Sequence, residues 1–196
     1  IAFKDFNPAL GIGGSPWSGL KYFKQFISSP SFWQLIKNTV LLNLYQLLIC
    51  FPASILFALM LNELGNQKFE RVVQMVTYAP YFISVVAMVG MIQLFLKYDS
   101  GVINNLLALL GMERRDFLTD PKAFRTIYVL SDLWQFTGWN AIIYIAALSS
   151  IDPQLIESAI VEGDNRLQKI WYIDIPDILG TIVIMLILKV GQILNT

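Results

Sequence analysis

Long apolar stretches separated by shorter polar segments dominate the chain. They cover residues 38–61, 72–96, 125–149 and 178–196. The first three exceed the roughly 20 residues that a helix needs to cross a bilayer, and the fourth only just reaches that length. Because lipid offers no hydrogen-bond partners, each stretch must be helical, and Pro52 and Pro80 predict kinks in two of them. The pattern predicts an all-α membrane protein, a polytopic transmembrane helical bundle with about four spans.

Composition supports this class and excludes several others. With 56% hydrophobic and 14% charged residues, the chain has too little polar surface for an ordinary soluble domain of 196 residues. A single cysteine, Cys50, and no histidine leave no internal disulfide and no usual metal or acid–base site. No phosphate-binding G-x-x-x-x-G-K loop occurs, and a net charge of zero carries no nucleic-acid signal. We therefore expect neither catalysis nor a cofactor in this chain.

The polar segment 150–177 has an unusual pattern for a loop that joins two spans. Asp152 can accept hydrogen bonds from the following turn while Pro153 suits the first helical position, so a helix should begin there. Gly163 is placed to end it in the left-handed conformation. Apolar residues recur at helical spacing between these signals: Leu155, Ile156, Ala159 and Ile160.

Helical spacing then resumes after the glycine. Leu167, Ile170 and Trp171 predict a second short helix, and Pro176 should push the chain before it toward extended geometry. A helix, a glycine break and a second helix predict a segment that docks a partner. The alternative is an amphipathic helix lying on lipid, although Arg166 and Lys169 supply few cations for that role.

This segment resembles the EAA loop of the inner-membrane permease subunits of bacterial ATP-driven importers. Residues at the motif's positions are Glu157, Ala159 and Gly163, with Ile173 and Pro176 downstream and Ile151-Asp152-Pro153 as the lead-in of sugar importers. Ser158 and Asp164 replace usual alanines. An ordered series elsewhere resembles carbohydrate-importer permeases: Gly19-Leu20, Tyr22-Phe23, Phe32-Trp33, Asn38-Thr39, Tyr78-Ala79-Pro80, Ile83-Ser84, Gly101, Asn104, Phe117, Asp120-Pro121, Trp134 and Gly138-Trp139. Residues 1–8 are similar to those of permeases for oligosaccharides or complex sugars.

The resemblance to maltose-type sugar permeases implies a type I importer fold and a multi-pass location in the bacterial cytoplasmic membrane. It implies four kinds of partner: a second homologous permease subunit, two ATPase subunits that bind ATP and Mg²⁺, an extracytoplasmic solute-binding protein, and a carbohydrate. ATP hydrolysis would then reside in a separate chain. The resemblance also implies the residues that couple to the ATPase: Asp152, Leu155, Ile156, Glu157, Ala159, Ile160 and Gly163.

Polar and aromatic residues inside the apolar stretches indicate a substrate path, since such groups are costly against lipid. Aromatic rings suit the C–H faces of sugars, and amides and hydroxyls suit sugar hydroxyls. The candidates from residue type are Tyr78, Tyr81, Trp134, Gln135, Trp139 and Asn140. Alignment to the maltose-type permease implies sugar contacts at Tyr81, Trp134, Gln135 and Trp139, with further ones near Gln192 and Thr196. Packing between helices is the alternative role for each single aromatic.

Charge and family resemblance disagree on orientation. Segments 1–37 and 97–125 hold nine Lys and Arg residues, whereas segments 62–71 and 150–177 hold four. The positive-inside rule would place 150–177 outside, but a loop that docks an ATPase must face the cytosol, and we adopt that orientation. Residues 1–35 then form an outer segment with aromatics at headgroup level, Trp17, Tyr22, Phe23, Phe26, Phe32 and Trp33. Residues 102–110 predict an outer interfacial or re-entrant helix that ends at Gly111.

Two other classes fit parts of the sequence. An ion-coupled secondary transporter needs buried ionisable residues, and only Asp132 and Lys189 qualify within the apolar stretches. A non-transporting membrane scaffold fits the composition but leaves the spacing in 150–177 unexplained. Since the chain lacks an initiator methionine and stops in an apolar run, we expect a longer protein with one more helix before Ile1 and at least one after Thr196.

Overall fold

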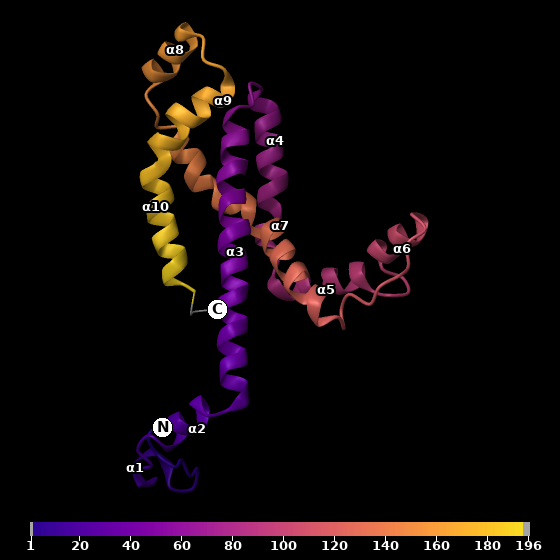
Figure 1. Cartoon of the computed structure of the whole chain (residues 1–196), viewed down its shortest axis with the longest axis vertical. Coiled ribbons are helices and arrows are strands. Elements are labelled where there is room, and N and C mark those ends of the chain that lie inside the picture. Colours follow the sequence, from indigo (N-terminus) through magenta and orange to yellow (C-terminus); the bar gives the residue numbers. More distant parts are fainter. Residues whose placement is uncertain (1, 194–196) are drawn as a thin grey trace. The chain divides into compact units, whose positions relative to one another are not determined.

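The computed structural model describes residues 2–193, except for the side chain of Ile160 (Figure 1). Every regular element in this part of the chain is helical, apart from an isolated antiparallel bridge between Lys4 and Trp17. The all-α prediction is therefore confirmed. The chain divides into two units, Ile1–Asn43 with Ile193–Thr196, and Leu44–Gln192, which are described separately.

The first unit contains two short helices, α1 (Gly11–Gly14) and α2 (Lys21–Ile27), and the first part of α3 (Pro30–Asn62). The Phe3 ring stacks on Trp17 with centroids 5.6 Å apart, beside the Lys4–Trp17 bridge. The Tyr22 hydroxyl donates to Asp5, and this hydrogen bond, followed by one from Lys21, lowers the pKa of the Asp5 carboxyl. These contacts fold residues 3–22 into a compact segment.

The predicted spans differ in how well the helices match them. Among the described residues, α3 is the only unbroken helix that is long and apolar enough to cross a membrane. It continues through Pro52, which lacks the N–H that would bond to the fourth residue before it. Ser54 lies two residues on, and its hydroxyl donates to the Cys50 carbonyl, 3.0 Å away.

The predicted span 72–96, with its expected kink at Pro80, corresponds to a broken pair of helices. It consists of α4 (Gln67–Tyr78), the 3₁₀ turn η1 (Ala79–Phe82) and α5 (Val85–Leu96), and the chain bends by 101° at the break. Pro80 occupies an early position of η1, and the Ser84 side chain caps α5 by accepting from the Ala87 N–H. The kink predicted at Pro80 is thus confirmed and is large, because a new helix begins just beyond it.

The other two predicted spans, 125–149 and 178–196, overlap α7 (Pro121–Leu148) and α10 (Ile175–Gly191), and residues 194–196 lie outside the described part of the chain. Helix α7 has sufficient length at 28 residues, but polar residues such as Asp132, Gln135 and Asn140 lower its hydropathy below that of α3. Helix α10 has 17 residues and begins before Ile178. Between α5 and α7 lies α6 (Val102–Leu109), as predicted, and Gly111 follows it with φ +75°.

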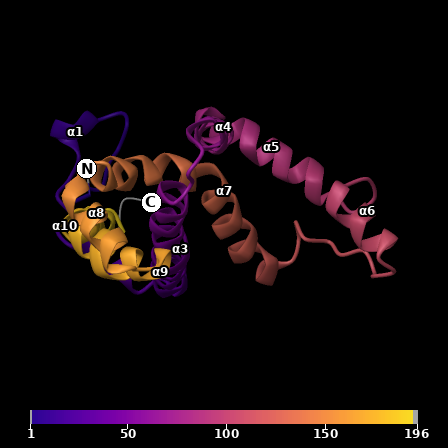
Figure 2. The same ribbon diagram turned by 90° about the horizontal axis from the view of Figure 1, so that it is seen from above.

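The core of the second unit joins α3, α7 and α10 around one side chain, Tyr144, which is almost fully buried. Its ring meets Phe51 of α3 edge-on. The buried residues of this cluster are Ala58, Leu59, Ala141, Tyr144, Leu148, Ile151 and Ile178. Within this unit α5 and α6 extend away from α8, α9 and α10 (Figure 2). Exposed leucine, isoleucine and valine residues along α3, α5 and α10 are suited to contact lipid or further helices.

Gly138 sets how closely α7 approaches α4. A Cβ atom at this position would lie 2.3 Å from the carbonyl oxygen of Thr77. We expect Gly138→Ala to destabilise the protein by about 1–3 kcal/mol, because the backbone of α4 must shift to admit the methyl group. Thermal unfolding of the purified protein measures this. Gly180→Ala is the control, since a Cβ there meets no atom within 4 Å, and an equal loss in both variants would contradict the expectation.

Candidate functional site

The 150–177 segment folds into two helices, α8 (Pro153–Glu162) and α9 (Arg166–Lys169). As predicted, α8 begins after Asp152, whose carboxylate accepts from the Gln154 N–H at 2.9 Å. It ends before Gly163, which has φ +87°. The Asp164 N–H then donates to the Ala159 carbonyl at 3.0 Å, the bond that closes a left-handed helix end. Figure 1 shows both helices together at one end of the second unit.

The second helix starts with a reciprocal cap and continues further than predicted. The Asn165 side chain accepts from the Gln168 N–H at 2.9 Å, and the Gln168 side chain accepts from the Asn165 N–H at 2.8 Å. Helix α9 runs on through a π-helical turn, η2 (Ile170–Asp174), into α10. The prediction that the chain is extended before Pro176 is wrong. The Ile175 N–H bonds to Ile170 five residues back, and this wider turn admits the proline.

The predicted coupling residues occupy two different sides of α8. Ile156 packs against the core of the second unit and Ala159 is 5% exposed, so both face the protein. Leu155, Glu157 and Gly163 are exposed, as is Asp152 at the start of the helix. Ile160 belongs to α8, and its side chain lies outside the described residues. The exposed members are the ones that remain available to a partner.

Further exposed apolar side chains lie on α8, α9 and η2. Val161 of α8 is 87% exposed and Tyr172 of η2 is 76% exposed. Leu155, Leu167 and Trp171 are also exposed. We call these five residues the apolar docking surface. Sequence periodicity did not single out Val161 and Tyr172, because periodicity shows which residues share a face and not which face is covered.

A buried ion cluster underlies α9 and η2. The Lys169 ammonium lies 2.5 Å from a carboxylate oxygen of Glu63, just after α3, and 3.3 Å from one of Asp174. The Asp174 side chain is 0% exposed and that of Lys169 is 16% exposed. We call Glu63, Lys169 and Asp174 the ion triad. It joins the second helix of the 150–177 segment to the end of α3, across 106 positions of sequence.

The protonation behaviour of the triad follows from burial and pairing. Burial raises the pKa of the Asp174 carboxyl, and the Lys169 charge offsets only part of that effect. Burial alone would lower the pKa of Lys169, but the hydrogen bond to Glu63 and the charges of both acids raise it overall. Lys169 therefore stays charged, as a bridge between two acids requires. One Asp174 oxygen, Oδ1, has no hydrogen-bond partner within the described chain.

The predicted substrate-path residues converge in part. The Tyr81 and Trp139 rings stack with centroids 4.0 Å apart and planes at 3°. Gln135 is buried and its amide donates to the Ile83 carbonyl at 2.9 Å, which pairs a backbone group freed by the bend. Trp134 is half exposed and lines a cavity of about 460 Å³ together with Thr77 and other residues of α3, α4 and α7.

The remaining candidates are not part of that arrangement. Tyr78 ends α4 and Asn140 lies within α7, both half-buried. Gln192 is exposed at the C-terminal cap of α10. Thr196 lies outside the described residues. The structure thus unites Tyr81 with Trp139 and ties Gln135 to the same bend, a combination that supplies aromatic faces beside amide groups.

In the described part of the chain, the helical elements, the membrane-length helix α3 and the capped pair α8 and α9 fit a membrane-embedded transport subunit. The chain belongs to the family of binding-protein-dependent transport system inner membrane components, whose family model matches residues 27–196. Its fold class is that of type I importer permeases, and its place is the inner membrane.

The similarity to known proteins extends over most of this chain. The polygalacturonan/rhamnogalacturonan transport system permease protein YteP of Bacillus subtilis (strain 168) is 44% identical over 195 residues, 100% of this chain. A chain of a bacterial ABC transporter involved in the import of the acidic polysaccharide alginate is 42% identical, with a TM-score of 0.90 over 92% of this chain. The chain spans 61% of the length of the first relative and 63% of the second.

Proposed function

We propose that the protein is the membrane-spanning permease subunit of an ATP-driven importer and that it forms half of a translocation path for a carbohydrate. The observation that carries this proposal is the α8–Gly163–α9 pair, which presents the apolar docking surface while the ion triad holds it to α3. A separate ATPase subunit would cover that surface. Movement of the ATPase would then tilt α3 and α10 through the triad.

The remaining partners follow from the same proposal. A second, homologous permease subunit would complete the path, and two ATPase subunits would bind ATP and Mg²⁺. An extracytoplasmic solute-binding protein would deliver the sugar, as in the crystal structure of a bacterial alginate ABC transporter in complex with an alginate pentasaccharide-bound periplasmic protein. Hydrolysis would occur in the ATPase chains, and this chain would perform no catalysis.

The substrate path would use the bend between α4 and α5. Stacked Tyr81 and Trp139 offer flat faces, and Trp134 faces a cavity on the same side of α7 as Gly138. A broken helix near a substrate site is a common transporter feature, since unwound backbone is tolerated where it lines a cavity. An oligosaccharide is the substrate class that this mixture of rings and amides suits best.

Reconstitution of the full-length permease with its partner permease, the ATPase and the binding protein tests this function. We expect ATP hydrolysis to rise several-fold when the binding protein carries an oligosaccharide, because sugar delivery would favour the ATP-closed state. The assay screens oligosaccharides against monosaccharides and peptides. A response to peptides alone would contradict the carbohydrate substrate, and a permease that retains no ATPase on purification would contradict the coupling role.

A further inference from the structure

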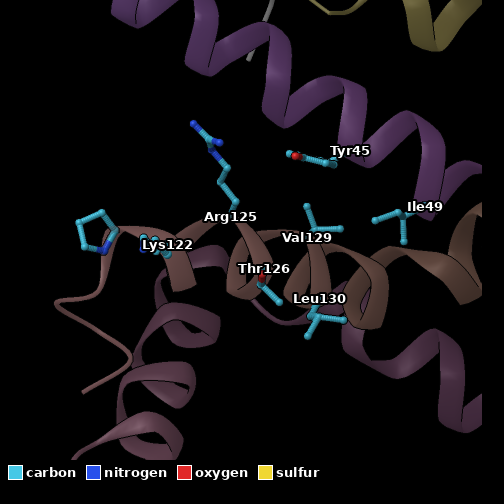
Figure 3. A pocket seen from close by; sticks show the side chains of 8 residues that line it. Tyr45, Ile49, Lys122, Arg125, Thr126, Val129 and Leu130 are labelled. Carbon is cyan, nitrogen blue, oxygen red and sulfur yellow. The ribbon is translucent and has the colours of Figure 1, made fainter. Parts of the chain in front are cut away.

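A cavity between α3 and the start of α7 is lined by two cations. Its volume is about 540 Å³, within the range of small-molecule sites. It is lined by Tyr45 and Ile49 from α3 and by Pro121, Lys122, Arg125, Thr126, Val129 and Leu130 from α7. Figure 3 shows Arg125 and Val129 directed from α7 toward α3, with Tyr45 and Ile49 facing them. The space is partly polar, whereas the cavity beside Met88 and Trp134 is almost wholly apolar.

Two cations line this cavity and neither is neutralised within the described residues. Lys122 and Arg125 lie one helical turn apart, and no carboxylate of the described chain lies within 4.0 Å of either charge. The nearby Asp120 carboxylate caps α7 by accepting from the Lys122 N–H at 2.8 Å. Lys122 is exposed and Arg125 is half-buried, so both charges are accessible to a ligand or to water.

The distribution of charge along the sequence favours an anionic ligand for these cations. Segments 1–37 and 97–125, which face outward under the proposed function, hold nine basic and five acidic residues, a net charge of +4. Segments 62–71 and 150–177 hold four basic and eight acidic residues, a net charge of −4. This is the reverse of the usual positive-inside distribution, so the outer cations serve something other than orientation. Cations that line a cavity without a paired carboxylate attract anionic solutes.

We infer that the cavity between Tyr45 and Arg125 is a binding subsite for the carboxylate of a uronate unit in an acidic oligosaccharide. The inference rests on the proposed function and adds the substrate's charge class. The Arg125 guanidinium matches a carboxylate with two parallel hydrogen bonds, and Lys122 adds a second positive charge. The Tyr45 ring offers a face for the sugar's C–H groups, and the Thr126 hydroxyl is a partner for a sugar hydroxyl.

Direct binding to the purified complex tests the subsite. Equilibrium dialysis would compare trigalacturonate with its trimethyl ester, which keeps the rings and removes the charges. We expect Arg125→Gln to weaken trigalacturonate binding by about tenfold or more and to leave ester binding unchanged, because only a charge-assisted hydrogen bond is lost. Lys122→Gln should give a smaller loss, and Arg125→Lys an intermediate one. Higher salt should weaken trigalacturonate binding and reduce these differences.

Lys97→Gln is the matched control, because Lys97 is an exposed cation of the same 97–125 segment that does not line the cavity. Equal affinity of the parent and Arg125→Gln for trigalacturonate would overturn the inference. So would a cavity that responds to phosphatidylglycerol in the detergent micelle and not to trigalacturonate, since that marks a lipid headgroup site. Either result leaves sugar-stimulated hydrolysis by the parent intact, whereas failure of the proposed function removes it.

Discussion

Lys169→Met is expected to cost the subunit about 3–5 kcal/mol of stability, because it leaves the buried Asp174 carboxylate and the neighbouring Glu63 without their shared cation. The loss has a mechanical consequence as well. Without the triad, α9 and η2 lose their ionic link to the end of α3. We therefore expect a lower midpoint of thermal unfolding for the purified complex and, at temperatures where it stays folded, hydrolysis that no longer responds to the loaded binding protein.

The triple variant Glu63→Gln/Lys169→Met/Asp174→Asn distinguishes the cost of an uncompensated buried charge from the loss of the link between α9 and α3. Removing all three charges leaves no uncompensated ion, so most of the lost stability should return. Coupling should remain weak in this variant, because the link between α9 and α3 has lost its ionic contacts. A triple variant that is as unstable as Lys169→Met would contradict the ion-pair explanation. Full coupling in the triple variant would contradict the mechanical role of the triad.

Gly163→Pro is expected to abolish retention of the ATPase. The native φ of +87° lies far from the value of about −65° that proline requires, so the chain cannot turn from α8 into α9 as it does now. The exposed apolar side chains of α8 and of α9 would then change their positions relative to one another. Co-purification of a tagged permease with its ATPase measures the effect, and membrane insertion should be normal because the change lies outside the spans.

A graded series at the same position sharpens this test. Gly163→Asn should be mild, since asparagine tolerates the left-handed region, whereas Gly163→Ala should cost about 1–2 kcal/mol. Gly65→Ala in the short segment before α4 is the control, because Gly65 has no positive φ and open space around it. Retention of the ATPase by Gly163→Pro would exclude this glycine as the hinge of the docking surface.

Glu157→Lys tests the charge on the exposed side of α8 and leaves the backbone conformation unchanged. The side chain is exposed on α8, so the reversal should leave folding unchanged and weaken ATPase binding through charge mismatch. Higher ionic strength should reduce the difference from the parent, because exposed charges are screened. A binding defect that is the same at low and high salt would instead indicate a change in the shape of α8.

Several elements of the site could be predicted from local chemistry. The start of α8 at Asp152-Pro153 and its end at Gly163 follow from capping and from the conformational freedom of glycine, which depend only on neighbouring residues. The break at Pro80 could also be predicted, because the effect of a proline on a helix depends only on neighbouring residues. The continuation of α9 through Pro176 was not, since a π-helical turn that removes the usual steric conflict leaves no mark in the sequence.

Hydropathy and local signals by themselves determined the helical membrane class and the paired helices of the 150–177 segment, because the bilayer and the backbone impose these on nearly any sequence with this pattern. Only the tertiary structure decided which side of α8 is covered, and that Lys169 lies between Glu63 and Asp174. It alone also placed Tyr81 on Trp139 and Arg125 opposite Tyr45. Apart from Lys169 and Asp174, these pairs join residues far apart in sequence, and their contact depends on how whole helices pack, which no short-range pattern records.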